Sequence, residues 1–311
     1  MTTNFIESCS SVKVLVAGDV MLDRYWYGNV ERISPESPVP IVEVAKSSDC
    51  LGGAGNVAAN VAALNSHCKL LSIIGEDEAG KRMLELLDKS NIQSKLHIDR
   101  AIRTTEKLRI VARNQQLLRV DFEDTPDHEI LSALGSAYEG ALENCDVVIM
   151  SDYGKGGLTH IASMIQEACA RNIPVVVDPK GADFSRYRGA SIITPNLKEF
   201  ATAGGIIVSE KTMADSALRM IDEYSLGSLL ITRSKDGMTL FLPDGKRIHS
   251  PATAREVFDV SGAGDTVVAI VALSIALQVE HDKMLDLCNQ AAGYVVSKFG
   301  TAVIEPSFLF D

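Results

Sequence analysis

The residues best suited to chemistry lie in the stretch 259–266, which reads D-V-S-G-A-G-D-T. The almost unbroken apolar run 267–277 that follows predicts a buried helix. Residues 262–264 would then lie at a helix N-terminus, whose free backbone N–H groups and dipole favour an anion such as phosphate. A carboxylate beside such a cradle, Asp265, suggests a base for phosphoryl transfer to a hydroxyl. The alternative is a glycine-rich turn whose aspartate caps the helix.

Three other groups of polar residues could take part in such chemistry. Asp19 and Asp23 follow the first apolar run, and Asp23 is either a ligand for sugar hydroxyls or a solvated loop acid. Asn196 and Glu199 fall on one face of a predicted helix start, where they could serve magnesium directly or through water. The alternative for this pair is a helix capping box, which the motif alone favours. The segment 232–237 is either a contact for nucleotide phosphates or ribose, or a hairpin turn.

Another glycine-rich stretch, 52–56, opens a predicted helix. Gly53 begins a G-x-G-x-x-A match to the dinucleotide-binding fingerprint, with Glu76 at a suitable distance downstream. That fingerprint should follow the first strand directly, whereas this one follows a strand flanked by prolines. We therefore favour a close approach of the Gly52-Gly53 backbone to a ligand, with Asn56 supplying an amide.

Composition limits the class of protein that carries these residues. The chain has 311 residues, 46% of them hydrophobic and 23% charged, which suits one α/β domain over 1–311 with a sizeable core. A net charge of −11 argues against nucleic-acid or anionic-membrane binding. The cysteines form no C-x-x-C pair and the histidines no H-x-x-x-H pair, which indicates free thiols and no zinc site. Without a signal-like or membrane-spanning run, we expect a cytoplasmic protein.

Short apolar runs that each end in a polar loop should position the site. This pattern predicts a parallel sheet with its site along the edge where the strands end. The predicted strands are 12–17, 70–74, 147–150, 175–177, 192–193 and 229–231, with helices at 57–64 and 161–170.

Two further strand pairs look separate from this alternation. The pair 25–29 and 39–45 is interrupted by prolines, which suit an edge hairpin, and 103–121 alternates around a turn at 114–116. We expect a small sheet from the segments 24–46 and 102–122. It could close over a substrate as a lid or form a dimer contact.

Taken in order, these motifs resemble the ribokinase-like (PfkB-type) carbohydrate kinases over nearly the whole chain. The markers are Gly52–Asn56, Asn196-x-x-Glu199 and Asp259–Thr266. Longer runs are similar to the D-glycero-β-D-manno-heptose-7-phosphate kinases within that family, namely 18–28, 32–36, 107–109 with 113–116, 151–153 and 178–181. The implied fold class is α/β, a three-layer sandwich with a central, mostly parallel sheet and a small β-sheet lid.

The resemblance implies ATP-dependent phosphorylation of the anomeric hydroxyl of heptose 7-phosphate to the 1,7-bisphosphate, for ADP-heptose and the lipopolysaccharide inner core. Asp265 would take the proton, and the backbone N–H groups of Gly262, Ala263 and Gly264 would face the charge on the transferred group. Asn196 and Glu199 would organise Mg²⁺.

The resemblance also implies binding residues for each substrate. Sugar hydroxyls would be held by Asp19 or Asp23, Gly52, Gly53 and Asn56, with Asp152 in the same set. The 7-phosphate needs a positive clamp, for which the candidates are Lys107, Arg109, Arg113, Lys180 and Arg24. The nucleotide would contact Thr232, Ser234, Gly237 and, beside the adenine, Asn289. A potassium ion would lie against Asp259, Ser261, Val295, Lys298 and Gly300, mostly through backbone carbonyls.

Some features depart from the family pattern or leave alternatives open. Ser234 stands where many members have glycine, which would narrow the approach to the nucleotide. The heptose kinase is often fused to an adenylyltransferase, and the chain ends at Asp311, so we expect a separate adenylyltransferase. The lid strands suggest a homodimer. The alternatives are another PfkB-type sugar or nucleoside kinase, or a non-catalytic sugar-phosphate sensor.

Overall fold

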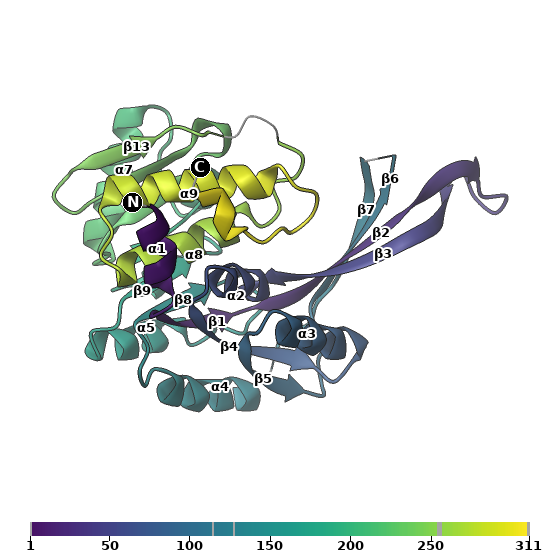
Figure 1. The fold of residues 1–311 in the computed structure, drawn as a ribbon, viewed down its shortest axis with the longest axis horizontal. Helices are drawn as coiled ribbons and strands as arrows, with labels where there is room; N and C mark the ends of the chain where they lie inside the picture. Colours follow the sequence, from purple (N-terminus) through teal and green to yellow (C-terminus); the bar gives the residue numbers. More distant parts are fainter. Residues whose placement is uncertain (1, 114, 127, 254–256, 310–311) are drawn as a thin grey trace.

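The main body is a nine-stranded sheet with helices on both faces (Figure 1). A computed structural model describes residues 2–113, 115–126, 128–253 and 257–309. In order across the sheet, the strands are β13 (Arg247–Ser250), β12 (Met238–Phe241), β11 (Leu229–Thr232), β10 (Ile192–Ile193), β9 (Val175–Asp178), β8 (Val147–Ser151), β1 (Lys13–Gly18), β4 (His67–Gly75) and β5 (Gln93–Asp99). All neighbours from β11 to β5 are parallel, and β12 and β13 are antiparallel, so the predicted parallel sheet is confirmed.

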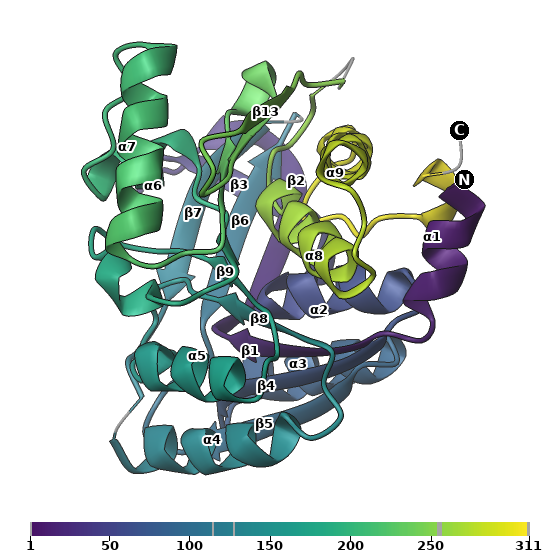
Figure 2. The ribbon, with the colours of Figure 1, turned by 90° about the vertical axis from the view of Figure 1, so that its left-hand side faces the viewer.

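Two helical layers cover the sheet, and each forms its own apolar core with one sheet face (Figure 2). The first layer contains α1 (Thr2–Cys9), α2 (Ala54–Ala63), α3 (Glu78–Lys89), α8 (Ala263–Ala276) and α9 (His281–Val296). The second contains α4 (His128–Ala141), α5 (Ile161–Ala170), α6 (Leu197–Thr202) and α7 (Glu210–Glu223). Short 3₁₀ turns are η1 (Phe184–Tyr187), η2 (Ser234–Asp236) and η3 (Pro306–Leu309). Within the described residues, no helix is long and apolar enough to cross a membrane.

Strand β1 shows why the strands of the main sheet have continuous apolar sequences. Val14 and Val16 point into the first core, whereas Leu15 and Ala17 point into the second. A strand buried on both faces needs apolar side chains at every position. The predicted helix 161–170 is confirmed residue for residue as α5, but α2 and α8 each begin before the predicted residue.

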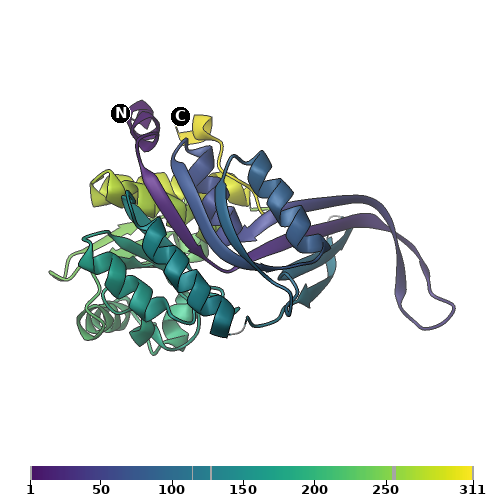
Figure 3. The ribbon, with the colours of Figure 1, turned by 90° about the horizontal axis from the view of Figure 1, so that it is seen from below.

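A second, four-stranded sheet projects from the main body (Figures 1 and 3). Its strands lie in the order β3 (Pro40–Gly53), β2 (Val20–Ile33), β6 (Glu106–Ala112) and β7 (Gln115–Phe122). We call it the lid sheet. Its β2–β3 hairpin is longer than predicted, because buried residues at the root of each strand continue the pairing toward the main sheet. Pro40 begins an edge strand, as its missing N–H group requires. The turn expected at 114–116 is shorter, because β7 already begins at Gln115; Asn114 lies outside the described residues.

Candidate active site

The glycine-rich turn forms the N-terminus of a buried helix, as the sequence predicts. Helix α8 begins at Ala263, and Gly262 precedes it with a φ of 80°, a left-handed conformation that glycine adopts without strain. Because the helix starts before the apolar run, Asp265 lies in its first turn. Ala263 and Gly264 line a cavity of about 740 Å³, a suitable size for a small ligand.

Asp265 is almost fully buried, with 3% of its surface exposed. Its Oδ1 accepts a hydrogen bond from the Tyr153 hydroxyl at 2.6 Å, and its Oδ2 accepts one from the Asn56 amide at 2.7 Å. Both oxygens thus bond to side chains, so this carboxylate is not the helix cap. Burial raises the pKa of Asp265 to about 6, although the two hydrogen bonds lower it; the charge of Asp23 raises it further and that of Lys107 lowers it. Such a pKa suits a general base near neutral pH.

Asp259 steadies the turn and is not a second base. Its Oδ1 accepts from the Ser261 N–H at 2.9 Å, and its Oδ2 accepts from the Gly300 N–H at 3.1 Å. Val295 lies at the end of α9, and its carbonyl accepts from the Lys298 N–H at 3.0 Å. The residues expected around potassium therefore gather where α9 ends. Their carboxylate and carbonyl oxygens are ligands that fit such an ion.

Asp23 lies at the root of β2, buried against the C-terminal segment. Its Oδ1 pairs with Arg109 at 2.5 Å, and its Oδ2 accepts from the Thr301 hydroxyl at 2.7 Å. A Cβ atom at Gly52 would lie 2.5 Å from Oδ2, and one at Gly53 would lie 2.4 Å from a backbone carbonyl. Glycine is therefore needed at both positions because the backbone there packs closely against Asp23 and Asp19, whether or not a ligand also approaches it.

The dinucleotide-binding alternative lacks its structural context. Gly53 ends β3 of the lid sheet, and α2 begins at the next residue. The motif therefore does not connect a strand of the main parallel sheet to a helix, as the fingerprint requires.

Asp19 and Asp152 organise the loop that follows β8. Asp19 accepts hydrogen bonds from the N–H groups of Tyr153, Lys155 and Gly157 at 2.9–3.0 Å. Asp152 accepts from the Gly154 N–H and from the Tyr187 hydroxyl, both at 2.8 Å. These contacts tie both carboxylates to the protein, as Arg109 and Thr301 tie that of Asp23. Burial and hydrogen bonding are therefore alike for Asp19 and Asp23, the two acids proposed for sugar hydroxyls.

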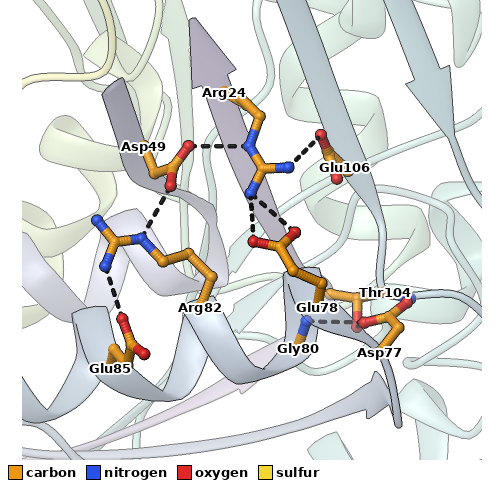
Figure 4. Close-up of polar contacts among 9 residues, drawn as sticks. All are labelled: Arg24, Asp49, Asp77, Glu78, Gly80, Arg82, Glu85, Thr104 and Glu106. Carbon is orange, nitrogen blue, oxygen red and sulfur yellow. Dashed lines mark hydrogen bonds and ion pairs between the residues drawn. The ribbon is translucent and has the colours of Figure 1, made fainter. Parts of the chain in front are cut away.

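Arg24 lies in a cluster of charges at the root of the lid sheet (Figure 4). It contacts the carboxylates of Asp49 at 2.9 Å, Glu78 at 3.0 Å and Glu106 at 3.3 Å. Arg82 of α3 also pairs with Asp49, at 2.8 Å. Arg24 is thus surrounded by acids, and this geometry assigns it to joining the lid sheet to α3 instead of the proposed phosphate clamp.

Replacing Arg24 with methionine should destabilise the fold and leave sugar binding intact. Glu106 is only 13% exposed and pairs with Arg24 alone among the described residues, so removing Arg24 leaves its buried charge uncompensated, whereas Asp49 keeps Arg82. We expect a loss of about 3 kcal/mol in unfolding free energy by urea titration. The control is Arg100→Met, which breaks a surface pair with Glu76 and should cost less than about 1 kcal/mol. If Arg24→Met instead raised the KM for the sugar and left stability unchanged, Arg24 would bind the 7-phosphate as first proposed.

Of the basic residues proposed for the 7-phosphate, Lys107 and Arg109 lie beside acids of the candidate site. Lys107 acts on Asp265, and Arg109 pairs with Asp23. Lys107 Nζ lies 5.4 Å from the centre of the Tyr153 ring, and no carboxylate of the described residues is within ion-pair distance of it. Burial lowers the pKa of Lys107, and the charge of Asp23 partly opposes this effect. An unpaired, half-buried ammonium group can receive an anion from a ligand.

Arg113 and Lys180 lie elsewhere. Arg113 is six residues beyond Lys107, about 20 Å farther along the lid sheet, where it donates to the Val30 carbonyl at 3.0 Å. Lys180 pairs with Glu199, at the start of α6, at 2.9 Å. The structure therefore does not bring all the proposed clamp residues together within one chain.

Asn196 and Glu199 form a reciprocal capping box at the start of α6. Asn196 Oδ1 accepts from the Glu199 N–H at 2.9 Å, and Glu199 Oε2 accepts from the Asn196 N–H at 3.1 Å. The capping alternative is therefore observed. It is compatible with a role toward magnesium, because Asn196 also lines the large cavity.

Asp178, at the end of β9, places a further carboxyl group near Glu199. Its pKa is raised well above its usual range by burial, then by the charges of Asp265 and Glu199, with Lys180 opposing them. The described residues include no group of three or more acidic, histidine or cysteine side chains able to hold a metal directly. Carboxyl groups close to Asn196 nevertheless fit Mg²⁺, which keeps waters and binds substrate phosphates.

The residues proposed for the nucleotide all line the 740 Å³ cavity: Thr232, Ser234, Gly237 and Asn289. The stretch 232–237 also forms the turn of the β11–β12 hairpin, so the hairpin interpretation is confirmed, and the nucleotide contact stays a prediction. Ser234 adopts a φ of 54°, a conformation for which glycine is favoured, which fits the glycine that the family resemblance leads us to expect there. A second cavity, of about 660 Å³ at the opposite edge of the sheet, contains none of the predicted site residues.

The sequence analysis did not identify Tyr153, Thr301 and Asp178 as site residues. Tyr153 and Asp178 occur within runs already noted as similar to the heptose kinases, which was the available signal. Thr301 had none, because its partner Asp23 is 278 residues away in the chain.

The fold and site together define a class of enzyme. A buried carboxyl group with a raised pKa, a helix N-terminus facing a ligand-sized cavity, and a projecting sheet that supplies Lys107 suit transfer of a phosphoryl group to a small molecule. Residues 11–307 match the model of the pfkB family carbohydrate kinases. The chain belongs to this family.

Curated relatives support the same assignment. The bifunctional protein HldE of Vibrio parahaemolyticus is 46% identical over 295 residues, which cover 95% of this chain and 62% of that protein. HldE of Histophilus somni is 47% identical over 292 residues, 94% of this chain and 62% of that protein. The chain thus spans about three-fifths of the length of these relatives.

Solved structures with the same fold are more distant in sequence. Escherichia coli phosphofructokinase-2 in complex with potassium has a TM-score of 0.80 at 17% identity, covering 96% of each chain. Arabidopsis thaliana ribokinase with ribose and ATP has a TM-score of 0.75 at 18% identity, covering 96% of this chain and 97% of that one. The expected ribokinase-like sandwich is confirmed.

Proposed function

We propose that the chain transfers the γ-phosphoryl group of ATP to the anomeric hydroxyl of D-glycero-β-D-manno-heptose 7-phosphate, giving the 1,7-bisphosphate. The observation that carries the proposal is the buried base Asp265, at an anion-binding helix N-terminus, with the unpaired ammonium of Lys107 nearby. The runs similar to heptose-7-phosphate kinases support this sugar over others.

The residues divide the reaction between them. Asp265 accepts the proton of the anomeric hydroxyl while the oxygen of that hydroxyl forms a bond to the γ-phosphorus. The bond between the γ-phosphorus and the oxygen that bridges it to the β-phosphate breaks, and ADP leaves. Backbone N–H groups at Gly262–Gly264 stabilise the charge that develops on the transferred group. Asp23 accepts hydrogen bonds from sugar hydroxyls, and Lys107 with Arg109 attracts the 7-phosphate.

Two cations fit the proposal. Magnesium would neutralise the nucleotide phosphates near Asn196 and Glu199, with the carboxyl group of Asp178 near Glu199. Potassium would lie against the turn at Asp259, Ser261 and Gly300. That E. coli phosphofructokinase-2 was solved with potassium supports this second assignment.

The proposed product needs a further reaction. Conversion of the 1,7-bisphosphate to ADP-heptose, for the lipopolysaccharide inner core, takes place through later steps that include an adenylyltransferase. The description of the curated relatives as bifunctional fits a kinase that works beside a second activity.

A homodimer through the lid sheet also fits. Large apolar side chains are exposed on its strands, among them Trp26, Val44, Leu118 and Phe122. Patches of this kind usually mark association surfaces. Light scattering should give twice the chain mass, and a monomer at micromolar concentration would refute the dimer.

The substrate proposal is tested by ADP release from a panel of sugars with and without a terminal phosphate, in Mg²⁺ and K⁺. We expect heptose 7-phosphate to be preferred. Lys107→Met should raise its KM at least about tenfold, because one charge-assisted contact is lost. The matched control is Lys46→Met, since Lys46 also lies over a tyrosine ring but is exposed.

Other outcomes would favour the alternatives. Equal turnover of unphosphorylated sugars would indicate a different sugar or nucleoside kinase of the same family. Binding of sugar phosphate without ADP release would indicate a sensor.

A further inference from the structure

Tyr153 contacts Asp265 directly, from a loop whose backbone is hydrogen-bonded to Asp19. The loop follows β8, and the Tyr153 N–H donates to Asp19 at 3.0 Å. The side chain extends from there so that its hydroxyl donates to Asp265 Oδ1 at 2.6 Å. This is a short hydrogen bond between a phenol and a carboxylate, and none of the roles assigned above uses it.

The two partners of Asp265 are held differently. Asn56, on Oδ2, is fully buried in α2, and the Asn60 amide donates to its Oδ1 at 3.3 Å. Tyr153, on Oδ1, is only partly buried and lies on a loop. A sugar hydroxyl that approaches the base along one of these hydrogen bonds takes the place of its donor, and Tyr153, on a loop and less buried than Asn56, is the more easily displaced of the two.

We propose that Tyr153 is a positioning residue for the base: its hydroxyl holds Asp265 Oδ1 in the sugar-free enzyme and yields that oxygen to the sugar hydroxyl. The inference rests on the proposed role of Asp265. Oδ1 is then the atom that receives the proton, while Oδ2 stays with Asn56. The phenol keeps the carboxylate oriented, and its departure couples sugar binding to exposure of the accepting oxygen.

Several charged groups share this region with the phenol and the base. Asp23 and Lys107 act on Asp265 from the lid sheet, and Asp178 acts on Tyr153 from β9. The hydrogen bond from Tyr153 stabilises the ionised form of Asp265, so its removal makes protonation easier.

The test is the pH dependence of the two rate parameters in Tyr153→Phe. The acid limb of kcat/KM reports the sugar-free enzyme, and we expect it to move up by about one pH unit, the effect of one hydrogen bond to a charged group. The acid limb of kcat should stay in place, because the phenol has already left the base in the complex. Ionisation of the sugar phosphate changes the pH dependence of the parent enzyme and of Tyr153→Phe in the same way, so it does not affect the comparison.

Tyr138→Phe is the matched control. Tyr138 is also a buried tyrosine, and its hydroxyl donates to the Met164 carbonyl at 3.0 Å, away from the site. Both limbs should match the parent in this variant. An unshifted kcat/KM limb in Tyr153→Phe would overturn the proposal. So would an equal shift of both limbs, which would mean that the phenol stays on the base throughout.

A second measurement needs no sugar and therefore separates this inference from the substrate assignment. The carboxyl carbon-13 shift of Asp265, identified by its loss in Asp265→Asn, is followed against pH in the substrate-free protein. Tyr153→Phe should raise the midpoint by about one unit. An unchanged midpoint would refute the role of Tyr153 even if heptose 7-phosphate is the substrate, whereas failure of the sugar panel alone would leave this result standing.

Discussion

Replacing Asp265 with asparagine will lower kcat at least about a hundredfold, the usual effect of removing a general base. Asparagine keeps the shape of the side chain, so it can accept from Asn56 and donate to the Tyr153 oxygen in place of the two present hydrogen bonds. What it loses is the ability to take the proton of the sugar hydroxyl. ADP release under saturating substrates measures the change.

Stability distinguishes this loss from misfolding. Because burial raises the pKa of Asp265 to about 6, its ionised form destabilises the folded state above that pH. Asparagine removes this cost, so the variant should unfold at higher denaturant at pH 8, by up to about 3 kcal/mol. The difference should fall as the pH drops from 6 and disappear near pH 4, where the carboxyl is protonated in the folded state.

A matched control is Asp146→Asn, at the opposite edge of the sheet, where the carboxylate accepts from the Lys13 N–H at 2.8 Å. Its kcat should equal that of the parent. If Asp265→Asn turned over at the parent rate, the assignment of the base would be wrong, and with it the mechanism proposed for this turn.

The fold could be predicted where local pattern and burial agree. The runs that became β8, β9, β10 and β11 are short, apolar and followed by polar loops, so each strand and its end could be placed from sequence. The turn before α8 was predictable for a similar reason, since glycines that precede a long apolar run have few other uses. The start of α8 was predicted less accurately, because its first turn consists of small and polar residues that show no apolar pattern.

Much of the site could not be predicted, because its contacts join distant parts of the chain. Tyr153 and Asp265 are 112 residues apart, and Asp23 and Arg109 are 86 apart. Arg24 shows the consequence. Its charge suggested a phosphate contact, yet its acidic neighbours come from β3, α3 and β6 and become adjacent only in the folded protein. Residue types and their spacing in the sequence indicate which side chains can do chemistry. The fold decides which of those side chains are already paired with other residues of the protein.

Replacing Gly262 with alanine should also lower kcat by about a hundredfold, through the backbone. Its φ of 80° strains any other residue, and an added Cβ would lie 2.7 Å from Asn56 Nδ2 and 3.0 Å from Thr301 Cγ2. Asn56 is fully buried and bonded to Asp265, so it must shift and release Oδ2. The turn N–H groups move with it, and losing one such donor typically costs a hundredfold or more in rate.

Gly264 provides the contrast within the same turn. A Cβ there meets no described atom within 4 Å, and the residue is helical, so Gly264→Ala should keep or increase stability, as should Gly135→Ala in α4. Because Gly264 lines the cavity, its methyl should raise the KM for ATP. Gly262→Ala should instead lose about 1–2 kcal/mol from the left-handed backbone alone. If Gly262→Ala kept the parent kcat, the turn would be a scaffold for the helix and not the site of phosphoryl transfer.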